Sequence, residues 1–192
     1  MAYRMYSTEG IVLGKKNIGE ANQILHIFTK DLGLVRAVAT GVRLEKAKLK
    51  NHIQLFSWIS MQCVRGKDTW RLTSAGTLAD RYPNSVDDRL KLKNIYIDIT
   101  KLLRHFGVYD VPQKELYGCI KDIFTHYTEI GATEKTLRLV VPLLMLYTLG
   151  YISHDFAKQC HCESLELCFA YVDGHKKEIK SVIEKTLEQV ST

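Results

Sequence analysis

The sequence predicts a two-domain α+β protein, with a five-stranded β-barrel over residues 1–80 and an all-α helical domain over residues 81–192. Three observations support this fold class. The first 80 residues contain short apolar segments with strand-like alternation, and polar turns separate them. After Pro83 the apolar residues recur at helical spacing instead. Finally, the entire excess of positive charge lies in the first of these two parts.

The first three strands are predicted within the first 40 residues. Residues 9–14 and 23–29 are apolar segments, and the second is rich in β-branched and aromatic side chains, which favour strands. Residues 15–22 between them are polar and contain a glycine, which is typical of a connecting loop. We expect a turn at residues 31–33, and the alternation across residues 34–40 predicts a third strand that is buried on both faces.

Two more strands form a predicted hairpin. Residues 55–64 alternate in character, residues 65–68 indicate a turn, and residues 69–73 make the second strand. The basic stretch at residues 41–52 lacks strand alternation and connects the third strand to the fourth. Five short strands with a longer connection at this point match a barrel of the oligonucleotide-binding (OB) type better than a sandwich, although periodicity alone leaves other small barrels open.

Two helices are predicted after the barrel. Residues 85–88 resemble a capping box, and the apolar stripe that follows them runs to Phe106 and stops at Gly107. A second helix begins near Asp110, has a proline in its first turn and runs to about residue 130.

The remaining helices complete a predicted bundle. We expect Thr133 to cap a third helix. Residues 139–147 of this helix are apolar on every side, so we expect it to lie at the centre of the bundle and to bend at Pro142. Residues 176–190 place apolar side chains on one face and predict a final amphipathic helix.

Composition argues against several classes of protein. No stretch reaches the ~18 to 20 apolar residues that a membrane span needs, and residues 1–6 lack the apolar run of a secretory signal. The five cysteines are an odd number and are mostly scattered, which argues against a disulfide framework. We therefore expect a soluble, cytoplasmic protein with reduced thiols and no membrane partner.

Positive charge is concentrated in the predicted barrel. Residues 1–80 contain 12 Lys and Arg against 6 Asp and Glu, whereas the remaining residues contain 15 of each. Residues 36–50 contain five cations and one acid, Glu45, and cations on such a connection can replace the counterions of a phosphate backbone. An ordinary solvated run of charges would have the same composition. The candidate nucleic-acid-binding residues are Arg36, Arg43, Lys46, Lys48, Lys50, Lys15, Lys16 and Arg71, while Arg65 and Lys67 add charge to the same domain.

Four aromatic side chains of the barrel, those of Phe28, Phe56, Trp58 and Trp70, have the chemistry to stack on unpaired bases. Phe56 and Trp58 stand two residues apart, on one face of their predicted strand. Because large aromatic side chains usually fill cores, we expect most of the four to be buried.

Several segments of the chain follow one another in a recognisable order. They are residues 9–13, 19–29, 33–43, 55–73 and 144–151. In this order they resemble the RecO family of bacterial recombination mediators, most specifically over the first 45 residues.

The resemblance implies an OB-fold nucleic-acid-binding domain followed by a helical domain, without catalytic chemistry. Proteins like RecO bind single- and double-stranded DNA, anneal complementary strands covered by single-stranded-DNA-binding protein, and help RecR to load RecA. The resemblance therefore implies DNA repair and recombination in the bacterial cytoplasm, at the nucleoid. The implied partners are DNA, RecR, single-stranded-DNA-binding protein and, indirectly, RecA. Arg36 and Arg43 match the family's basic strand and loop.

Two alternatives share these features. In the first, the chain is an adaptor whose helical domain docks single-stranded-DNA-binding protein or RecR, and its nucleic-acid binding is weak. The neutral balance of charge in residues 81–192 is consistent with protein contacts there. In the second, the barrel binds RNA rather than DNA.

The tail departs from the family pattern. Many relatives carry a zinc module of two Cys-x-x-Cys pairs, whereas this chain has Cys160, Cys162 and Cys168 and no later cysteine. Two thiolates only two residues apart suit a tetrahedral site poorly, so the tail resembles a shortened, degenerate module and we expect no metal cofactor. A site of three cysteines completed by one histidine stays open, with the candidates His154, His161 and His175.

Catalytic chemistry has little support in the sequence. Cys160 and His161 are neighbours whose side chains need not meet, and Asp87 and Asp88 belong at a helix start. The chain also lacks a Gly-x-Ser-x-Gly motif and a phosphate-binding glycine loop. We therefore expect no enzymatic activity and no catalytic residue.

Overall fold

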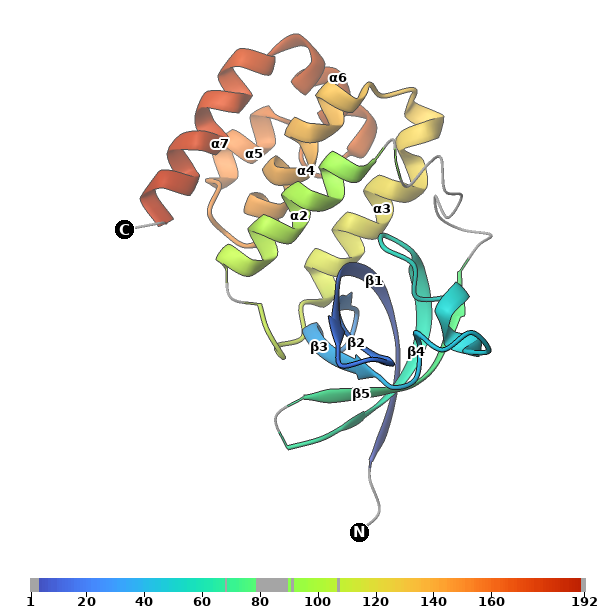
Figure 1. Cartoon of the computed structure of the whole chain (residues 1–192). Helices are drawn as coiled ribbons and strands as arrows, with labels where there is room; N and C mark the ends of the chain where they lie inside the picture. Colours follow the sequence, from blue (N-terminus) through green and yellow to red (C-terminus); the bar gives the residue numbers. More distant parts are fainter. Residues whose placement is uncertain (1–3, 68, 79–89, 91, 107, 191–192) are drawn as a thin grey trace. The chain divides into compact units, whose positions relative to one another are not determined.

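Five strands close into a barrel in the order β1-β2-β3-β5-β4, and β1 also pairs with β4 (Figure 1). They are β1 (Met5–Ile18), β2 (Asn22–Thr29), β3 (Gly33–Ala39), β4 (Trp58–Arg65) and β5 (Trp70–Thr77). Neighbouring strands are antiparallel except β3 and β5, which are parallel. The prediction of a five-stranded barrel of the OB type followed by helices is confirmed.

This computed structural model describes residues 4–67, 69–78, 90, 92–106 and 108–190. The chain divides into two compact units, Met1–Tyr117 and Gly118–Thr192. The predicted domain boundary at residue 80, the predicted cap at residues 85–88 and the predicted stop at Gly107 lie outside the described residues.

β1 is longer than the sequence pattern predicts, and the loop predicted over residues 15–22 is only a turn at residues 19–21. β1 continues to Ile18, and Gly19 opens the turn to β2 with a left-handed φ of 55°, which glycine adopts without strain. The polar residues were misleading because residues 16–18 at the end of this hairpin are all exposed and so show no apolar alternation. A bulge between Val12 and Gly14 bends the strand, so that its first half pairs with β4 and its second half with β2.

β4 begins at Trp58, so the strand predicted over residues 55–64 starts too early. Phe56 has a left-handed φ of 64°, and its N–H donates to the carbonyl of Val12 over 2.7 Å, as in a turn rather than a ladder. The connection from β3 to β4 contains a short 3-10 helix, η1 (Lys48–Asn51), in the basic stretch that lacks strand alternation.

Apolar side chains fill the barrel and also cover part of its outside. Outside the barrel, Phe56 stacks on Tyr96 of α2 (Lys93–His105) with ring centroids 4.8 Å apart, and the Trp58 indole donates to the Tyr96 hydroxyl over 3.1 Å. Tyr117 packs near Trp58, with ring centroids 6.0 Å apart. All four candidate stacking residues are buried, so the expectation that most of them belong to the core is confirmed. The interior cluster consists of Val12, Leu25, Ile27, Val35, Ala37, Ala39, Val42, Ile53, Ile59, Met61, Cys63, Trp70 and Leu72.

The edge of β3 that faces away from β2 is shared by β5 and the segment that follows α2. β5 pairs with the second half of β3. In the first half, the N–H of Leu34 donates to Val108 over 3.0 Å, and the N–H of Asp110 donates back to Leu34 over 3.1 Å. Gly33 permits this close approach, because its φ is 71° and a Cβ there would collide with the carbonyl oxygen of Val111.

In the part of the chain that the structure describes, five further helices follow α2 (Figure 1). α3 (Lys114–Ile130) begins in the first unit and ends in the second. The second unit also contains α4 (Glu134–Thr148), α5 (His154–Gln159), α6 (Leu165–Gly174) and α7 (Lys176–Val190).

α4 is the central helix of the second unit. Thr133 caps it, since the Thr133 hydroxyl accepts a hydrogen bond from the N–H of Thr136, and Pro142 is buried within the helix. α6 and α7 pack against α4, and the prediction of α7 is confirmed. The sequence did not predict α5 and α6, because their segment lacks a clear helical stripe. Within the described residues, no helix combines the length and the apolar character needed to cross a membrane.

Candidate nucleic-acid interface

The strand register aligns a row of residues on the outside of β1, β2, β3 and β5. Lys16 pairs with Ile24, Ile24 with Val38, and Val38 with Arg71. Residues directly opposite one another in neighbouring strands share a face of the sheet. Leu25, which follows Ile24, lies in the barrel core. The row therefore points away from the interior, with a lysine at one end and an arginine at the other.

A second outward row lies beside the first. Gly14 pairs with His26, and His26 pairs with Arg36, whose side chain is exposed. Arg36 and Val38 are two residues apart in β3 and therefore share a face. Ile24 and Val38 are half-buried, so apolar surface lies between the cations. We call this surface the cationic face; it consists of Lys16, Ile24, Val38, Arg71, His26 and Arg36.

Lys15 lies on the other side of β1 from Lys16. It pairs with Leu25 of the barrel core, and desolvation of its half-buried side chain lowers the pKa of its ammonium group. Sequence reasoning grouped the two lysines because they are adjacent. The register separates them, and only Lys16 belongs to the cationic face.

Arg43 is held against the turn between β1 and β2. Its N–H donates to the carbonyl of Ala21 over 3.0 Å, and its guanidinium Nη1 donates to the carbonyl of Gly19 over 2.7 Å. The N–H of Gly41 donates to the side-chain oxygen of Asn22 over 2.9 Å. These bonds place Arg43 at the end of the barrel where β1 turns into β2, and this turn begins three residues after Lys16.

Lys46, Lys48 and Lys50 are exposed on the connection between β3 and β4. Lys48 and Lys50 belong to η1, and Leu49 between them packs against the barrel core. The structure therefore places these three lysines beyond the end of β3, next to Arg43 in the chain, rather than on the cationic face itself.

The positive charge of Arg65 is partly offset by a neighbouring carboxylate, which the sequence alone does not indicate. Its guanidinium forms an ion pair with Asp110 over 2.9 Å and lies 4.8 Å from the centre of the Trp70 ring. The Trp70 indole donates to the same carboxylate over 2.7 Å. Asp110 therefore offsets the charge of Arg65 at the start of the β4–β5 turn, while Lys67 in that turn is exposed.

His26 and Arg104 are two residues of this region that sequence reasoning did not select. The pKa of His26 is lowered by burial first and then by the charges of Arg104 and Arg36. Strand alternation alone would have placed His26 on the face of Arg36. The approach of Arg104, however, depends on how α2 packs beside the barrel.

Comparison with known proteins supports the same architecture. A family model described as "Recombination protein O N terminal" matches residues 1–80. The DNA repair protein RecO of Gloeothece citriformis is 31% identical over 134 residues, which make up 70% of this chain and 46% of the relative. The chain belongs to the RecO family.

Other RecO relatives match to a similar degree. The DNA repair protein RecO of Dehalococcoides mccartyi is 32% identical over 102 residues, or 53% of this chain and 40% of the relative. That of Trichodesmium erythraeum is 26% identical over 167 residues, or 87% of this chain and 57% of the relative. The chain spans about half the length of the curated RecO relatives that it matches.

The cysteines considered as remnants of the RecO zinc module lie in the second unit. Cys160 and Cys168 are buried, and burial raises the pKa of Cys160 to about 12. A hydrogen bond from the Cys168 thiol lowers the pKa of Cys162. Among the described residues, no group of three or more His, Cys, Asp or Glu side chains is placed to hold a metal ion. The described geometry does not fit a zinc site, and zinc stays a hypothesis from the sequence alone.

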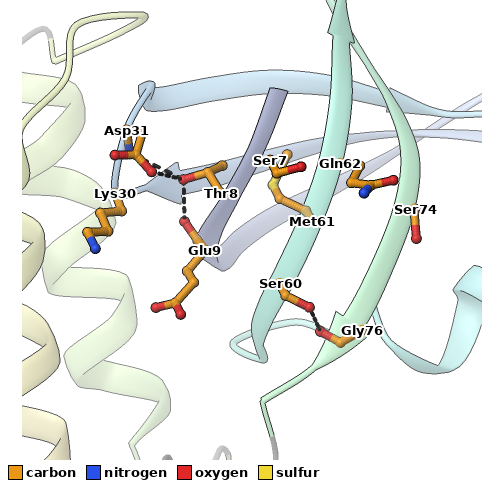
Figure 2. A pocket seen from close by; sticks show the side chains of 10 residues that line it. All are labelled: Ser7, Thr8, Glu9, Lys30, Asp31, Ser60, Met61, Gln62, Ser74 and Gly76. Carbon is orange, nitrogen blue, oxygen red and sulfur yellow. Dashed lines mark hydrogen bonds between the residues drawn. The ribbon is translucent and has the colours of Figure 1, made fainter. Parts of the chain in front are cut away.

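Another part of the barrel wall is hollowed but lacks a cationic character (Figure 2). The Thr8 hydroxyl donates to Asp31 over 2.8 Å, and Figure 2 shows the two side chains facing each other. Two carboxylates and a single ammonium group line the hollow, so it does not favour a polyanion. Within the described RecO barrel, the cationic face is the better candidate. The residues around the hollow are Ser7, Thr8, Glu9, Lys30, Asp31, Ser60, Met61, Gln62, Ser74 and Gly76.

Proposed function

We propose that this chain is a DNA repair and homologous recombination mediator that binds single- and double-stranded DNA through its barrel. In this proposal it anneals complementary strands and helps RecR to load RecA onto single-stranded DNA. The observation that carries the proposal is the outward row from Lys16 to Arg71, with Arg36 beside it and Arg43 held at its end. The proposed contacts are Arg36, Arg43, Lys46, Lys48, Lys50, Lys16 and Arg71, with Lys15 at the margin.

The chemistry of this surface suits a nucleic-acid backbone. Lysine and arginine side chains replace condensed counterions, and the gain in counterion entropy drives binding without regard to sequence. Ile24 and Val38 lie between the cations and offer apolar contact to sugars or unstacked bases. Two complementary strands repel each other until their charge is locally neutralised, so a cationic surface favours annealing.

The proposed partners are DNA, RecR and single-stranded-DNA-binding protein, with RecA reached indirectly. The relatives are named DNA repair proteins, which supports a role on DNA. The adaptor hypothesis differs in one measurable respect, because it requires docking of a protein partner but little affinity for nucleic acid. The second alternative is that the barrel binds RNA rather than DNA, and a binding experiment with both nucleic acids distinguishes the two.

Equilibrium binding to a fluorescein-labelled oligo(dT) strand tests the proposal. If about five cations contact phosphates, the logarithm of the affinity should fall against the logarithm of salt concentration with a slope of roughly −3 to −4. The triple variant Arg36→Glu, Arg43→Glu, Lys46→Glu should lose binding and keep the wild-type circular dichroism spectrum. A matched triple reversal on exposed lysines of the second unit, Lys135→Glu, Lys158→Glu, Lys177→Glu, should bind like the wild type.

Annealing separates the mediator from the adaptor. Complementary strands precoated with single-stranded-DNA-binding protein should anneal faster when the wild-type chain is added at low salt. Docking of that protein without faster annealing and without salt-dependent DNA binding would support the adaptor instead. A matched RNA strand that binds more tightly than the DNA strand would favour the RNA-binding alternative.

A further inference from the structure

We propose that His26, Arg36 and Arg104 together form a binding site for one backbone phosphate of the nucleic-acid strand, so that the interface extends from the barrel onto α2. We call this set of three residues the phosphate site. The inference rests on the proposed function, since it assigns a subsite to a strand lying on the cationic face. The phosphate site adds α2, His26 and Arg104 to an interface that the sequence analysis placed on the barrel alone.

The strand register places no side chain opposite the His26 ring on its β1 side. His26 pairs with Gly14 on β1 and with Arg36 on β3. A Cβ built at Gly14 would lie 3.5 Å from the Cβ and the Cδ2 of His26, in ordinary contact with the ring. Because glycine has no side chain, this space stays open. A ligand can therefore approach the ring from the cationic face.

Among the described residues, the two charged side chains that act on His26 are both positive. Arg36 comes from β3 and Arg104 from α2, and both are near enough to act on the ring electrostatically. Both arginine side chains are exposed, and neither has an acidic partner among the residues that the structure describes. β1 contributes no charge directly opposite the ring, because Gly14 stands there. Two guanidinium groups near one imidazole, without an acidic partner in the described part of the chain, suit a bound anion.

The hydrogen-bonding state of His26 indicates the role of its ring. Its Nδ1 is buried and has no partner among the described groups, so a proton there would be unsatisfied. A neutral ring with its proton on Nε2 avoids this cost, because Nδ1 then carries no proton. Nε2–H is then a donor for a phosphate oxygen, while the two guanidinium groups supply the charge.

A phosphodiester fits this site better than an isolated anion does. Lys16 and Arg71 lie in the neighbouring row on the same face, and Arg43 is held at the β1–β2 turn. A single small anion would occupy the phosphate site and leave these cations without a ligand. An extended polyanion contacts them together, as the spaced phosphates of a nucleic-acid strand do.

Arg104→Ala tests the phosphate site in the full chain, with Lys101→Ala as the matched control. Lys101 is an exposed cation of α2, one turn before Arg104, and it is not among the charges that act on His26. With labelled oligo(dT) at low salt, Arg104→Ala should bind roughly ten-fold more weakly, and its salt slope should be shallower by about 0.7. Lys101→Ala should bind like the wild type. The fold-loss of affinity in the double variant Arg36→Ala, Arg104→Ala should be smaller than the product of the fold-losses in the two single variants, because both side chains would hold the same phosphate.

Nuclear magnetic resonance of the His26 ring supplies a second measurement. The pKa of His26 should rise when oligo(dT) binds to the wild type, because an anion then faces the ring, and should rise less in Arg104→Ala. Equal binding by Arg104→Ala, Lys101→Ala and the wild type, or an unchanged His26 pKa on binding, would overturn the phosphate site and leave the proposed function standing. Absence of salt-dependent binding by the wild type would overturn both.

Discussion

The Trp70 indole and the Asp110 carboxylate are joined by a hydrogen bond of 2.7 Å, although the two residues lie 40 positions apart in the chain. The same carboxylate forms an ion pair with Arg65 over 2.9 Å. Asp110 belongs to the segment that pairs with β3 at Leu34. This one side chain therefore attaches the segment after α2 to the β4–β5 hairpin of the barrel.

Asp110→Ala should lower the free energy of unfolding by about 1 to 2 kcal/mol. The larger share should come from the buried Trp70 indole, which loses its acceptor, because the ion pair with Arg65 is exposed to solvent and contributes little. Urea unfolding followed by tryptophan fluorescence measures the change. Lys114→Ala is the control, since Lys114 is 68% exposed and approaches Asp31 only to 3.8 Å. Equal losses in the two variants would contradict the role assigned to Asp110.

Gly33→Ala should destabilise the chain far more than Gly19→Ala does. Both glycines have a left-handed φ, so each substitution costs about 1 kcal/mol of backbone strain. At Gly19 a Cβ would meet nothing within 4 Å, whereas at Gly33 it would collide with the carbonyl oxygens of Val108 and Val111. In urea unfolding, we expect the free energies of unfolding of the two variants to differ by at least about 2 kcal/mol. The larger loss at Gly33 arises because β3 must move away from the segment that follows α2. Similar stabilities would show that the pairing of β3 with this segment is weak.

His26 should make the stability of the chain depend on pH. Its pKa in the folded state lies below its ordinary value of 6.5, so below pH 6.5 the unfolded chain takes up a proton before the folded chain does. The free energy of unfolding should therefore be highest above pH 6.5 and fall as the pH drops from 6.5 toward the folded pKa. His26→Gln should show a smaller change between pH 7.5 and 5.5 in urea unfolding. An equal change in both proteins would assign the effect to other groups.

Cys162 should be the first thiol that iodoacetamide alkylates in the folded chain near pH 7.5. A hydrogen bond from Cys168 lowers its pKa, and its side chain is partly exposed. Burial raises the pKa of Cys63 and Cys119 to about 11 in each case, so these thiols stay protonated. Peptide mass spectrometry at short times should find the label on Cys162.

Two variants check the origin of this reactivity. Cys162→Ser should remove the fast phase of labelling, and Cys168→Ala should slow it because the donor is lost. Fast labelling of Cys168 in place of Cys162 in the wild type would show that the hydrogen bond runs in the opposite direction.

Much of the fold was predictable because its signals are local. The β-branched and aromatic content of β2, the alternation in β3, the Thr133 cap and the apolar stripe of α7 depend on neighbours in the sequence, and the structure contains each of these elements. The loop predicted over residues 15–22 was too long for a physical reason. An exposed two-stranded ribbon with a short turn has the same polar composition as a loop, and only its pairing partner distinguishes the two.

The sequence by itself determined that the barrel carries the excess charge and that Arg36 stands on a strand. The prediction that this strand is buried on both faces was wrong at Arg36, which is exposed. Only the tertiary structure decided which cations share a surface. Register placed Lys16 and Lys15 on opposite sides of β1, and Asp110 offset the charge of Arg65. The approach of Arg104 to His26 likewise depends on contacts between segments far apart in the chain, which no local pattern of residues records.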